Sequence, residues 1–438
     1  MRNRPIVILL VFVLVLWTQH AWGKVYIDID SPAFQKFPIA IQDFKNLHAS
    51  GDDIGLSSWF ADELGQVIDI TGFFRVITRG AFLENAERSG ISAAETDFRD
   101  WRAIGSDFLV KGGFAKDETK LTVEIRLFDV VEGRLIAGKR YTGTPEDKKT
   151  IIVKFAEEIL LALTGERGVY NTRIAFVGRK GQISEIYTIR FDGSDLKRVT
   201  DYKSLTLIPR WAPDGSRLSL TSYIKNNPDS YILNLRNLQR SNLTNFRGLN
   251  MAHSWSPDGK KILMTLSKDG NEEIYSMNIQ TKKLERLTND PAIDVSPCWS
   301  PDGSKIVFVS SRSGSPQIFV MDSGGRNIRR ITFEGSYNTS PVWSPKGGKI
   351  AYEGATDGTF QLFLIEEDGS GLMQLTFEDG GCEAPAWSPD GRYLSFISGK
   401  GGMKKVCIIN SNGLNLRVLG GTELMDSLKN PSWSPQLD

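Results

Sequence analysis

The sequence has 438 residues, of which 40% are hydrophobic and 24% are charged. These values exclude a disordered chain and exceed what one compact core holds, so we expect two or three folded domains. Because 53 Lys and Arg balance 52 Asp and Glu, the chain lacks the charge excess of a general nucleic-acid binder or of a protein that binds anionic membranes.

The first 23 residues have the pattern of a secretory signal peptide. Arg2 and Arg4 precede an apolar run at 6–17, and a small-x-small end follows at 21–23. This pattern predicts cleavage after Gly23 and export of the mature chain. The run of 12 apolar residues is too short for the roughly 30 Å hydrocarbon core of a bilayer, so a retained membrane span is the weaker alternative.

A short segment at 24–37 precedes the first expected domain. Apolar and polar side chains alternate in it, with Val25, Ile27 and Ile29 set between Tyr26, Asp28 and Asp30. Alternation is typical of a β-strand, and a mobile strand of this kind could pair with the sheet edge of another protein. The alternative is an edge strand packed on its own domain, and the sequence leaves both open.

Residues 38–168 predict a small α/β domain. Extended segments are expected at 38–41, 74–77, 108–114, 121–130 and 134–141, and helices near 59–68, near 98–103 and from 145–147 onward. The last helix has its apolar residues on one face. The glycines here lack the spacing of a dinucleotide or phosphate-binding loop, so we expect no cofactor.

The second half of the chain repeats every 44 residues. An aromatic or Cys recurs in the middle of each unit, and a Trp-Ser-Pro or Trp-Ala-Pro turn marks each boundary. A Leu-Thr, Ile-Thr or Val-Thr pair recurs near the end of the first five units, and Leu419-Gly420 takes its place in the last. The turn tryptophans are Trp211, Trp255, Trp299, Trp343, Trp387 and Trp433. Each unit holds four β-prone segments, the signature of a WD40-like (PD40) propeller blade.

The phase of the repeat predicts how the ring closes. The first blade, near 173–190, has no Trp motif before it, whereas the last motif at 430–435 has no blade after it. We therefore expect an all-β six-bladed propeller at 169–438, in which the C-terminal strand completes the first blade.

Catalysis and metal binding find little support in the sequence. The chain after residue 23 has only His48 and His253, and no Gly-x-Ser-x-Gly motif, so a Ser-His-Asp site is not expected. His253 stands where other units have Pro and is interpreted as a repeat variant. Turn geometry explains the repeated Asp258, Asp302 and Asp390, so no metal site is expected, although the sequence leaves open whether a cation lies in the channel.

The cysteines Cys298, Cys382 and Cys407 are interpreted as small buried hydrophobes, with a Cys298–Cys382 bridge left open.

Four segments are similar to signature segments of the TolB family: Asp-Trp-Arg-Ala-Ile-Gly at 100–105, Arg-Leu-Phe-Asp-Val at 126–130, Leu-Thr-Gly-Glu-Arg-Gly at 163–168 and Asn-Thr-Arg-Ile-Ala-Phe-Val at 171–177. With the six-bladed array, the resemblance covers essentially the whole mature chain. It implies a periplasmic, monomeric and non-catalytic scaffold of the Tol-Pal system that supports outer-membrane constriction during cell division and envelope integrity. The alternative is a propeller-based hydrolase or lyase that acts on peptides or glycans.

The resemblance also implies two partner sites. The lipoprotein Pal would bind at one mouth of the propeller channel, through the loops that lead into each inner strand. One departure is Leu249, where the family often has His. TolA would bind the N-terminal segment at Val25, Tyr26, Ile27, Asp28, Ile29, Asp30 and Ser31. The residues implied for Pal are Leu205, Leu249, Asn250, Asp294, Tyr337, Asn338 and Glu383.

Overall fold

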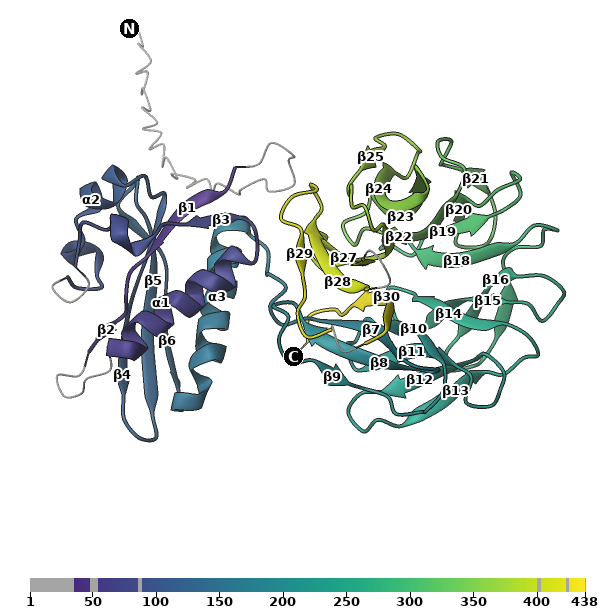
Figure 1. Ribbon diagram of the computed structural model, residues 1–438, viewed down its shortest axis with the longest axis horizontal. Helices are drawn as coiled ribbons and strands as arrows, with labels where there is room; N and C mark the ends of the chain where they lie inside the picture. The colour runs from purple at the N-terminus through teal and green to yellow at the C-terminus, as the bar shows by residue number, and fades with distance from the viewer. Residues whose placement is uncertain (1–34, 48–53, 86–88, 400–402, 423–424, 438) are drawn as a thin grey trace, which may run out of the picture.

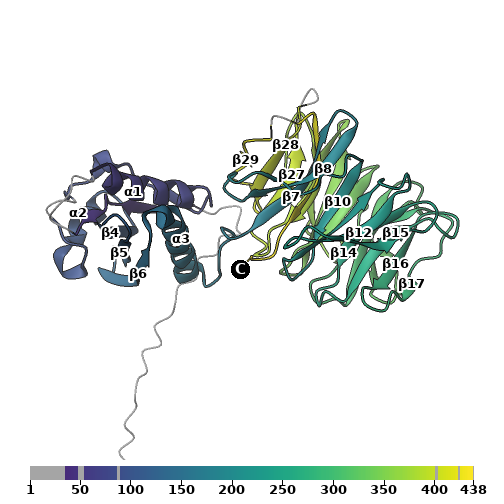
Figure 2. The same ribbon diagram turned by 90° about the horizontal axis from the view of Figure 1, so that it is seen from below.

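The computed structural model describes residues 35–47, 54–85, 89–399, 403–422 and 425–437 (Figure 1 and Figure 2). An α/β domain lies beside a six-bladed β-propeller, as the sequence predicted. The expected signal peptide at 1–23 and the expected TolA-binding residues 25–31 lie outside the described residues. Within the described ranges, no helix has the length and apolar character needed to cross a membrane.

A mixed sheet with strand order β3-β1-β4-β5-β6 forms the N-terminal domain, and β2 pairs with β4. The helices α1 and α3 contact each other, and α3 also packs on β5 and β6. Ile152, Phe155, Ile159 and Leu163 are buried on one face of α3, which confirms the helical pattern. The elements are β1 (Phe37–Ile41), β2 (Lys45–Asn46), α1 (Ile54–Asp69), β3 (Phe74–Val76), α2 (Phe98–Ala103), β4 (Phe108–Lys116), β5 (Leu121–Asp129), β6 (Arg134–Gly143) and α3 (Lys148–Thr164), with short 3₁₀ turns at Arg79–Ala81, Ala93–Glu95 and Pro145–Asp147.

One boundary expected from the sequence differs in the structure. Phe37, placed at the end of the N-terminal segment 24–37, is the first residue of β1 and pairs in parallel register with Phe74. Its strand lies between β3 and β4, so it belongs to the body of the sheet.

Six four-stranded antiparallel sheets form the propeller, one for each repeat. The inner strands are β10 (Thr206–Trp211), β14 (Asn250–Trp255), β18 (Asp294–Trp299), β22 (Asn338–Trp343), β26 (Cys382–Trp387) and β30 (Ser427–Trp433). The second strands are β7 (Arg173–Lys180), β11 (Arg217–Ser222), β15 (Lys261–Leu266), β19 (Lys305–Ser310), β23 (Lys349–Thr356) and β27 (Tyr393–Ser398). The third strands are β8 (Ile183–Arg190), β12 (Asp229–Asn234), β16 (Glu273–Asn278), β20 (Gln317–Asp322), β24 (Thr359–Glu366) and β28 (Lys405–Asn410). The outer strands are β9 (Lys197–Arg198), β13 (Arg240–Thr244), β17 (Leu284–Arg286), β21 (Arg329–Arg330), β25 (Met373–Gln374) and β29 (Arg417–Val418).

The ring closes as the repeat phase predicted. The strand β30 pairs antiparallel with β7, with Trp433 opposite Ile174, so the first blade takes its inner strand from the C-terminal segment. The backbone N–H of Arg173 donates to Ser434 Oγ at 2.9 Å and reinforces the same seam.

A bulge interrupts each inner strand at the same repeat position. In five blades it consists of a residue with positive φ followed by Pro, and its first residues are Ile208, Ser296, Ser340, Ala384 and Asn430, with φ between 49° and 55°. Pro has no backbone N–H, so the bulge does not create an unpaired donor at this position. The strand β14 has Ala252-His253 instead, and there the pairing shifts between Ala252 and Ser254 without a positive φ.

The Pro-Asp-Gly turns at the ends of the inner strands confirm the structural interpretation of their aspartates. Ser256 Oγ donates to Asp258 Oδ1 at 2.6 Å, and Ser388 makes the same bond to Asp390. Hydrogen bonds from Ser300 and Ser304 lower the pKa of Asp302 to about 2. These carboxylates therefore accept hydrogen bonds from serines of their own turns.

The N-terminal domain packs on the end of the propeller where the second strands begin. Tyr393, the first residue of β27, donates from its hydroxyl to the carbonyl oxygen of Thr71 at 3.3 Å, and its ring lies 5.8 Å from that of Phe73. Asn415 donates to the carbonyl oxygen of Ile70 at 3.2 Å. A single apolar cluster contains Leu64 and Phe155 of one domain together with Trp433 of the other, so the two domains share a core.

Candidate functional site

A threonine hydroxyl fixes the loop end of most blades. Thr332 Oγ1 donates to Gln317 Oε1 at 2.7 Å and accepts from the backbone N–H of Ile318 at 2.9 Å. We call this arrangement the threonine latch. It joins the third strand to the second residue after the outer strand, and so explains the Thr of the sequence repeat. The same pairing occurs between Thr200 and Glu185, Thr288 and Glu273, and Thr376 and Gln361.

We call the loop that leads to the next inner strand the approach loop. The Glu or Gln side chain that accepts from the latch threonine also accepts a hydrogen bond from this loop or from the residue that ends it. Glu185 accepts from the N–H of Lys203 at 2.7 Å, and Glu273 accepts from the N–H of Asp290 at 2.8 Å. Gln317 accepts from Asn338 Nδ2 at 2.8 Å. The approach loops are therefore tied to the buried ends of the third strands.

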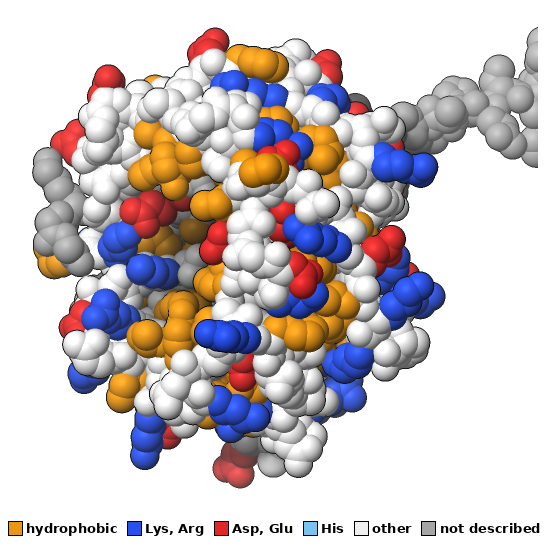
Figure 3. Space-filling model, turned by 90° about the vertical axis from the view of Figure 1, so that its right-hand side faces the viewer, with side chains coloured by type: hydrophobic (Ala, Val, Ile, Leu, Met, Phe, Trp, Pro, Cys, Tyr) orange, Lys and Arg blue, Asp and Glu red, His pale blue; other side chains and the backbone are white. Residues whose placement is uncertain are grey.

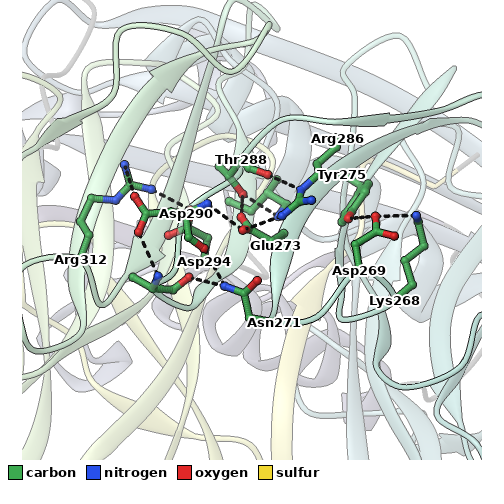
Figure 4. Close-up of polar contacts among 12 residues, drawn as sticks. Lys268, Asp269, Asn271, Glu273, Tyr275, Arg286, Thr288, Asp290, Asp294 and Arg312 are labelled. Atoms are coloured by element: carbon green, nitrogen blue, oxygen red, sulfur yellow. Dashed lines mark hydrogen bonds and ion pairs between the residues drawn. The ribbon is translucent and has the colours of Figure 1, made fainter.

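The approach loop before β18 shows this network in detail (Figure 4). The buried Glu273 pairs with Arg286 at 2.9 Å, and the buried Asp294 pairs with Arg312 at 2.7 Å. Burial raises the pKa of Asp294, although Arg312 opposes the shift. Asn271 Nδ2 donates to the carbonyl oxygens of Asp290 and Ala292 at 2.7 and 2.8 Å. These contacts hold a short loop whose next residue, Ile293, is exposed.

Large apolar side chains are exposed at the same end of the propeller. The end carries the approach loops and the loops between second and third strands, and it faces away from the N-terminal domain. Figure 3 shows it hollowed near its centre, with hydrophobic side chains around the hollow. The exposed large apolar residues of these two sets of loops are called the mouth ring; they are Ile183 (40% exposed), Leu205 (39%), Ile293 (47%), Phe333 (73%), Tyr337 (43%), Phe377 (75%) and Met403 (74%). Exposed apolar side chains gathered on one face are typical of a surface that binds another macromolecule.

The residues that the family resemblance implied for Pal binding divide into two groups. Leu205 and Tyr337 belong to the mouth ring, and the half-exposed Glu383 forms an ion pair with Lys404 at 2.5 Å. Leu249 is partly buried in the approach loop before β14. Three others occupy one repeat position at the start of their strands and are buried, namely Asn250, Asp294 and Asn338.

The buried group holds loops in place. Asn250 Nδ2 donates to the carbonyl oxygens of Phe246 and Gly248 at 2.7 and 2.9 Å, and Asn338 Nδ2 donates to the carbonyl oxygen of Glu334 at 2.8 Å. These side chains shape the mouth of the channel without lying on its surface.

The residues implied for Pal did not include five members of the mouth ring: Ile183, Ile293, Phe333, Phe377 and Met403. A signal was present for two of them, because Phe333 and Phe377 lie 44 residues apart, each directly after the repeated Thr of its blade. An exposed aromatic at a fixed repeat position indicates that one end of the ring carries it for contact.

The channel along the ring axis has a volume of about 510 Å³ and is lined by the inner strands. His253 lies in its wall, and burial together with the neighbouring Arg210 lowers the pKa of His253 to about 3. A neutral imidazole of this kind is a poor general base near neutral pH. The described residues contain no group of His, Cys, Asp and Glu that could hold a metal ion.

Cys298, Cys382 and Cys407 are unpaired, so the Cys298–Cys382 bridge left open by the sequence is not formed.

Comparison with known proteins identifies the family. Residues 161–437 match the model described as the TolB beta propeller domain, and residues 25–136 match the TolB amino-terminal domain. The chain belongs to the TolB family. This confirms the resemblance inferred from the signature segments and the propeller repeat.

Individual TolB proteins show how far the likeness extends. The Tol-Pal system protein TolB of Syntrophus aciditrophicus is 46% identical over 219 residues, 49% of this chain and 48% of that protein. That of Desulfosudis oleivorans is 39% identical over 210 residues, 48% of each chain. The chain thus spans about half the length of the curated relatives it matches. The crystal structure of TolB from Acinetobacter baumannii superposes with a TM-score of 0.78 at 27% identity, over 92% of this chain and 97% of that one.

The names of these relatives bear on the question of catalysis. Each is named as a component of the Tol-Pal system or as TolB, and none of those given above is named as an enzyme. This agrees with the expectation that the TolB chain described here is not an enzyme.

Proposed function

We propose that this TolB-family chain is a non-catalytic periplasmic scaffold of the Tol-Pal system, which supports outer-membrane constriction during cell division and envelope integrity. Pal binds at the mouth ring, and TolA binds the N-terminal segment at 25–31. The mouth ring carries this proposal, because seven large apolar side chains are exposed on the one end of the propeller that the N-terminal domain leaves uncovered.

The rigidity of the mouth supports a binding role. The approach loops are tied to buried carboxylates and amides, as Asp290 is tied to Glu273 and Asn338 to Gln317. A surface held in one conformation loses little entropy when a partner binds. The edge-on contact of Tyr337 with Phe360, 5.5 Å between ring centroids, further fixes one anchor of the ring.

The proposed TolA segment rests on the family resemblance and on its alternating sequence. Ser31 precedes the first residue of β1, Phe37, by six positions, so the segment can be removed without loss of the sheet. A chain that begins at Gln35 keeps β1, whereas one that begins at Asp43 lacks this strand between β3 and β4 and is expected to unfold the domain.

Calorimetry with the soluble domain of Pal from the same organism tests the first site. We expect Tyr337→Ala and Leu205→Ser each to weaken binding by about tenfold or more, since both remove an apolar anchor from a rigid surface. The matched control is Leu238→Ser, which changes a 59% exposed leucine in a loop at the opposite end of the propeller and is expected to bind normally. Equal binding by all three variants would place the Pal site elsewhere.

The second site is tested with the periplasmic domain of TolA and the chain that begins at Gln35. We expect this shortened chain to lose TolA binding and to retain Pal binding. Retained TolA binding would exclude residues 25–31 as the site. Cell fractionation, with the mature protein expected in the periplasmic fraction, tests the proposed location.

A further inference from the structure

Two residues depart from the repeat on neighbouring inner strands. The residues directly before the six tryptophans form one ring around the channel: Arg210, Ser254, Cys298, Val342, Ala386 and Ser432. Arg210 is the single charged residue of this ring. The position before it is Pro in five strands and His253 in β14. Arg210 on β10 and His253 on β14 therefore lie together on one side of the channel, and each contributes to its wall.

The guanidinium of Arg210 has no carboxylate partner among the described residues. Its Nη1 donates to the carbonyl oxygen of Pro209, the preceding residue, at 2.9 Å. No Asp or Glu lines the channel within the described ranges. Glu353, which lies behind the wall formed by β22 and β26, already accepts from Ser340 Oγ at 2.9 Å and from the N–H of Ala384 at 2.6 Å. Burial lowers the pKa of Arg210 to about 10, which still leaves it a cation near neutral pH.

His253 adds a second unsatisfied group at the same place. Its Nε2 is buried and has no hydrogen-bond partner in the part of the chain that the structure describes. A buried polar atom without a partner and a partly buried cation without a counter-ion both destabilise a folded protein, and a ligand that supplies the missing acceptor reduces both penalties.

We propose that the channel wall at Arg210 and His253 binds a carboxylate group. The planar guanidinium presents paired N–H donors that match the two oxygens of a carboxylate, and the imidazole supplies one further N–H. Small or uncharged residues on the remaining strands, Val342, Ala386 and Ser432, leave the rest of the ring open. The volume of about 510 Å³ suits a small organic acid or a few residues of an extended peptide. This inference does not depend on the identity of the partner at the mouth ring.

The test uses the mature protein and three probes: acetate, a Gly-Gly-Gly-Gly peptide with a free C-terminus, and the same peptide with a C-terminal amide. Chemical-shift changes of the His253 imidazole and calorimetry report binding at constant ionic strength. We expect saturable binding of acetate and of the free peptide, and none of the amide. Tighter binding of the free peptide than of acetate indicates a peptide carboxylate, whereas equal or weaker binding indicates a small organic acid.

Substitutions in the channel wall make the test specific. Arg210→Met removes the charge and keeps the side-chain length, and we expect it to weaken acetate binding at least tenfold; Arg210→Lys retains part of the affinity. The matched control Arg236→Met removes an exposed arginine from the outer turn of the same blade and binds like the wild type. His253→Phe keeps an aromatic ring and removes the N–H, so it offers a second route if Arg210→Met fails to fold, and we expect weaker binding in it as well. The proposal is overturned if the wild type shows no saturable binding, or if Arg210→Met or His253→Phe folds and binds as the wild type does.

Discussion

The indole Nε1 of Trp433 donates a hydrogen bond to Thr172 Oγ1 at 2.8 Å, and this bond joins residues 261 positions apart in the chain. The same tryptophan packs against Phe191 and Tyr393, with ring centroids 5.9 and 6.2 Å away. Trp433 therefore belongs at once to the closure of the ring and to the core shared by the two domains.

The pairing of β30 with β7, which closes the ring, is expected to contribute to the stability of the whole protein. Trp433→Ala should lower the free energy of unfolding by about 3–5 kcal/mol, because it removes a large buried side chain and a hydrogen bond. Urea denaturation measures the change. The control Val418→Ala alters a 48% exposed residue of the outer strand β29 and should shift the midpoint little. A midpoint of Trp433→Ala close to that of the wild type would show that the ring is stable without this seam.

The threonine latch can be tested in a single blade. Thr332→Val keeps the shape of the side chain, but the buried N–H of Ile318 loses its acceptor and Gln317 loses a donor. We expect a loss of about 1–3 kcal/mol in the free energy of unfolding. Thr281→Val, at an exposed turn, is the matched control and should change stability by less than about 0.5 kcal/mol. Equal effects of the two substitutions would argue against the latch.

Substitutions at the adjacent residues Tyr337 and Asn338 should have different effects, the first on Pal binding and the second on stability. Tyr337→Ala changes a 43% exposed side chain and should leave urea denaturation nearly unchanged while it weakens Pal binding. Asn338→Ala removes hydrogen bonds to Gln317 and Glu334 and should lower the free energy of unfolding by about 1–3 kcal/mol. If Asn338→Ala were as stable as the wild type, the approach loop would not depend on this side chain.

His253 should make the fold sensitive to acid. Its pKa is near 6.5 in an unfolded chain and about 3 in the native protein, where burial and Arg210 disfavour the imidazolium. Between these values the unfolded state binds a proton that the native state does not, so stability is lost as the pH falls below 6.5. We expect the wild type to lose about 1.4 kcal/mol per pH unit more than His253→Gln between about pH 6 and about pH 4. Parallel pH profiles of the two proteins would show that His253 titrates normally in the fold.

Local pattern was sufficient to predict most of the architecture. The apolar face of α3, the boundaries of α2 and the 44-residue repeat each depend on residues close in sequence, and the repeat phase then fixed the partner of β7. The positive φ at Ser296 and its equivalents was not predicted, because it depends on a bulge against the neighbouring strand.

The site was harder to predict than the fold. Variation within a strict repeat identified the approach loops, but it could not distinguish the buried Asn338 from the exposed Tyr337 beside it. That difference depends on the latch acceptor Gln317, 21 residues away. The contact between Tyr393 and Thr71 joins residues 322 positions apart, and no local pattern encodes it.

The pairing of β30 with β7 also orders the assembly of the molecule. Until β30 has been synthesised, β7 has an unpaired edge, and the first blade lacks the strand that lines the channel. Unpaired edges and uncovered apolar surface are features that chaperones and proteases recognise. The seam therefore distinguishes a finished chain from an interrupted one, because only the finished chain can conceal this edge.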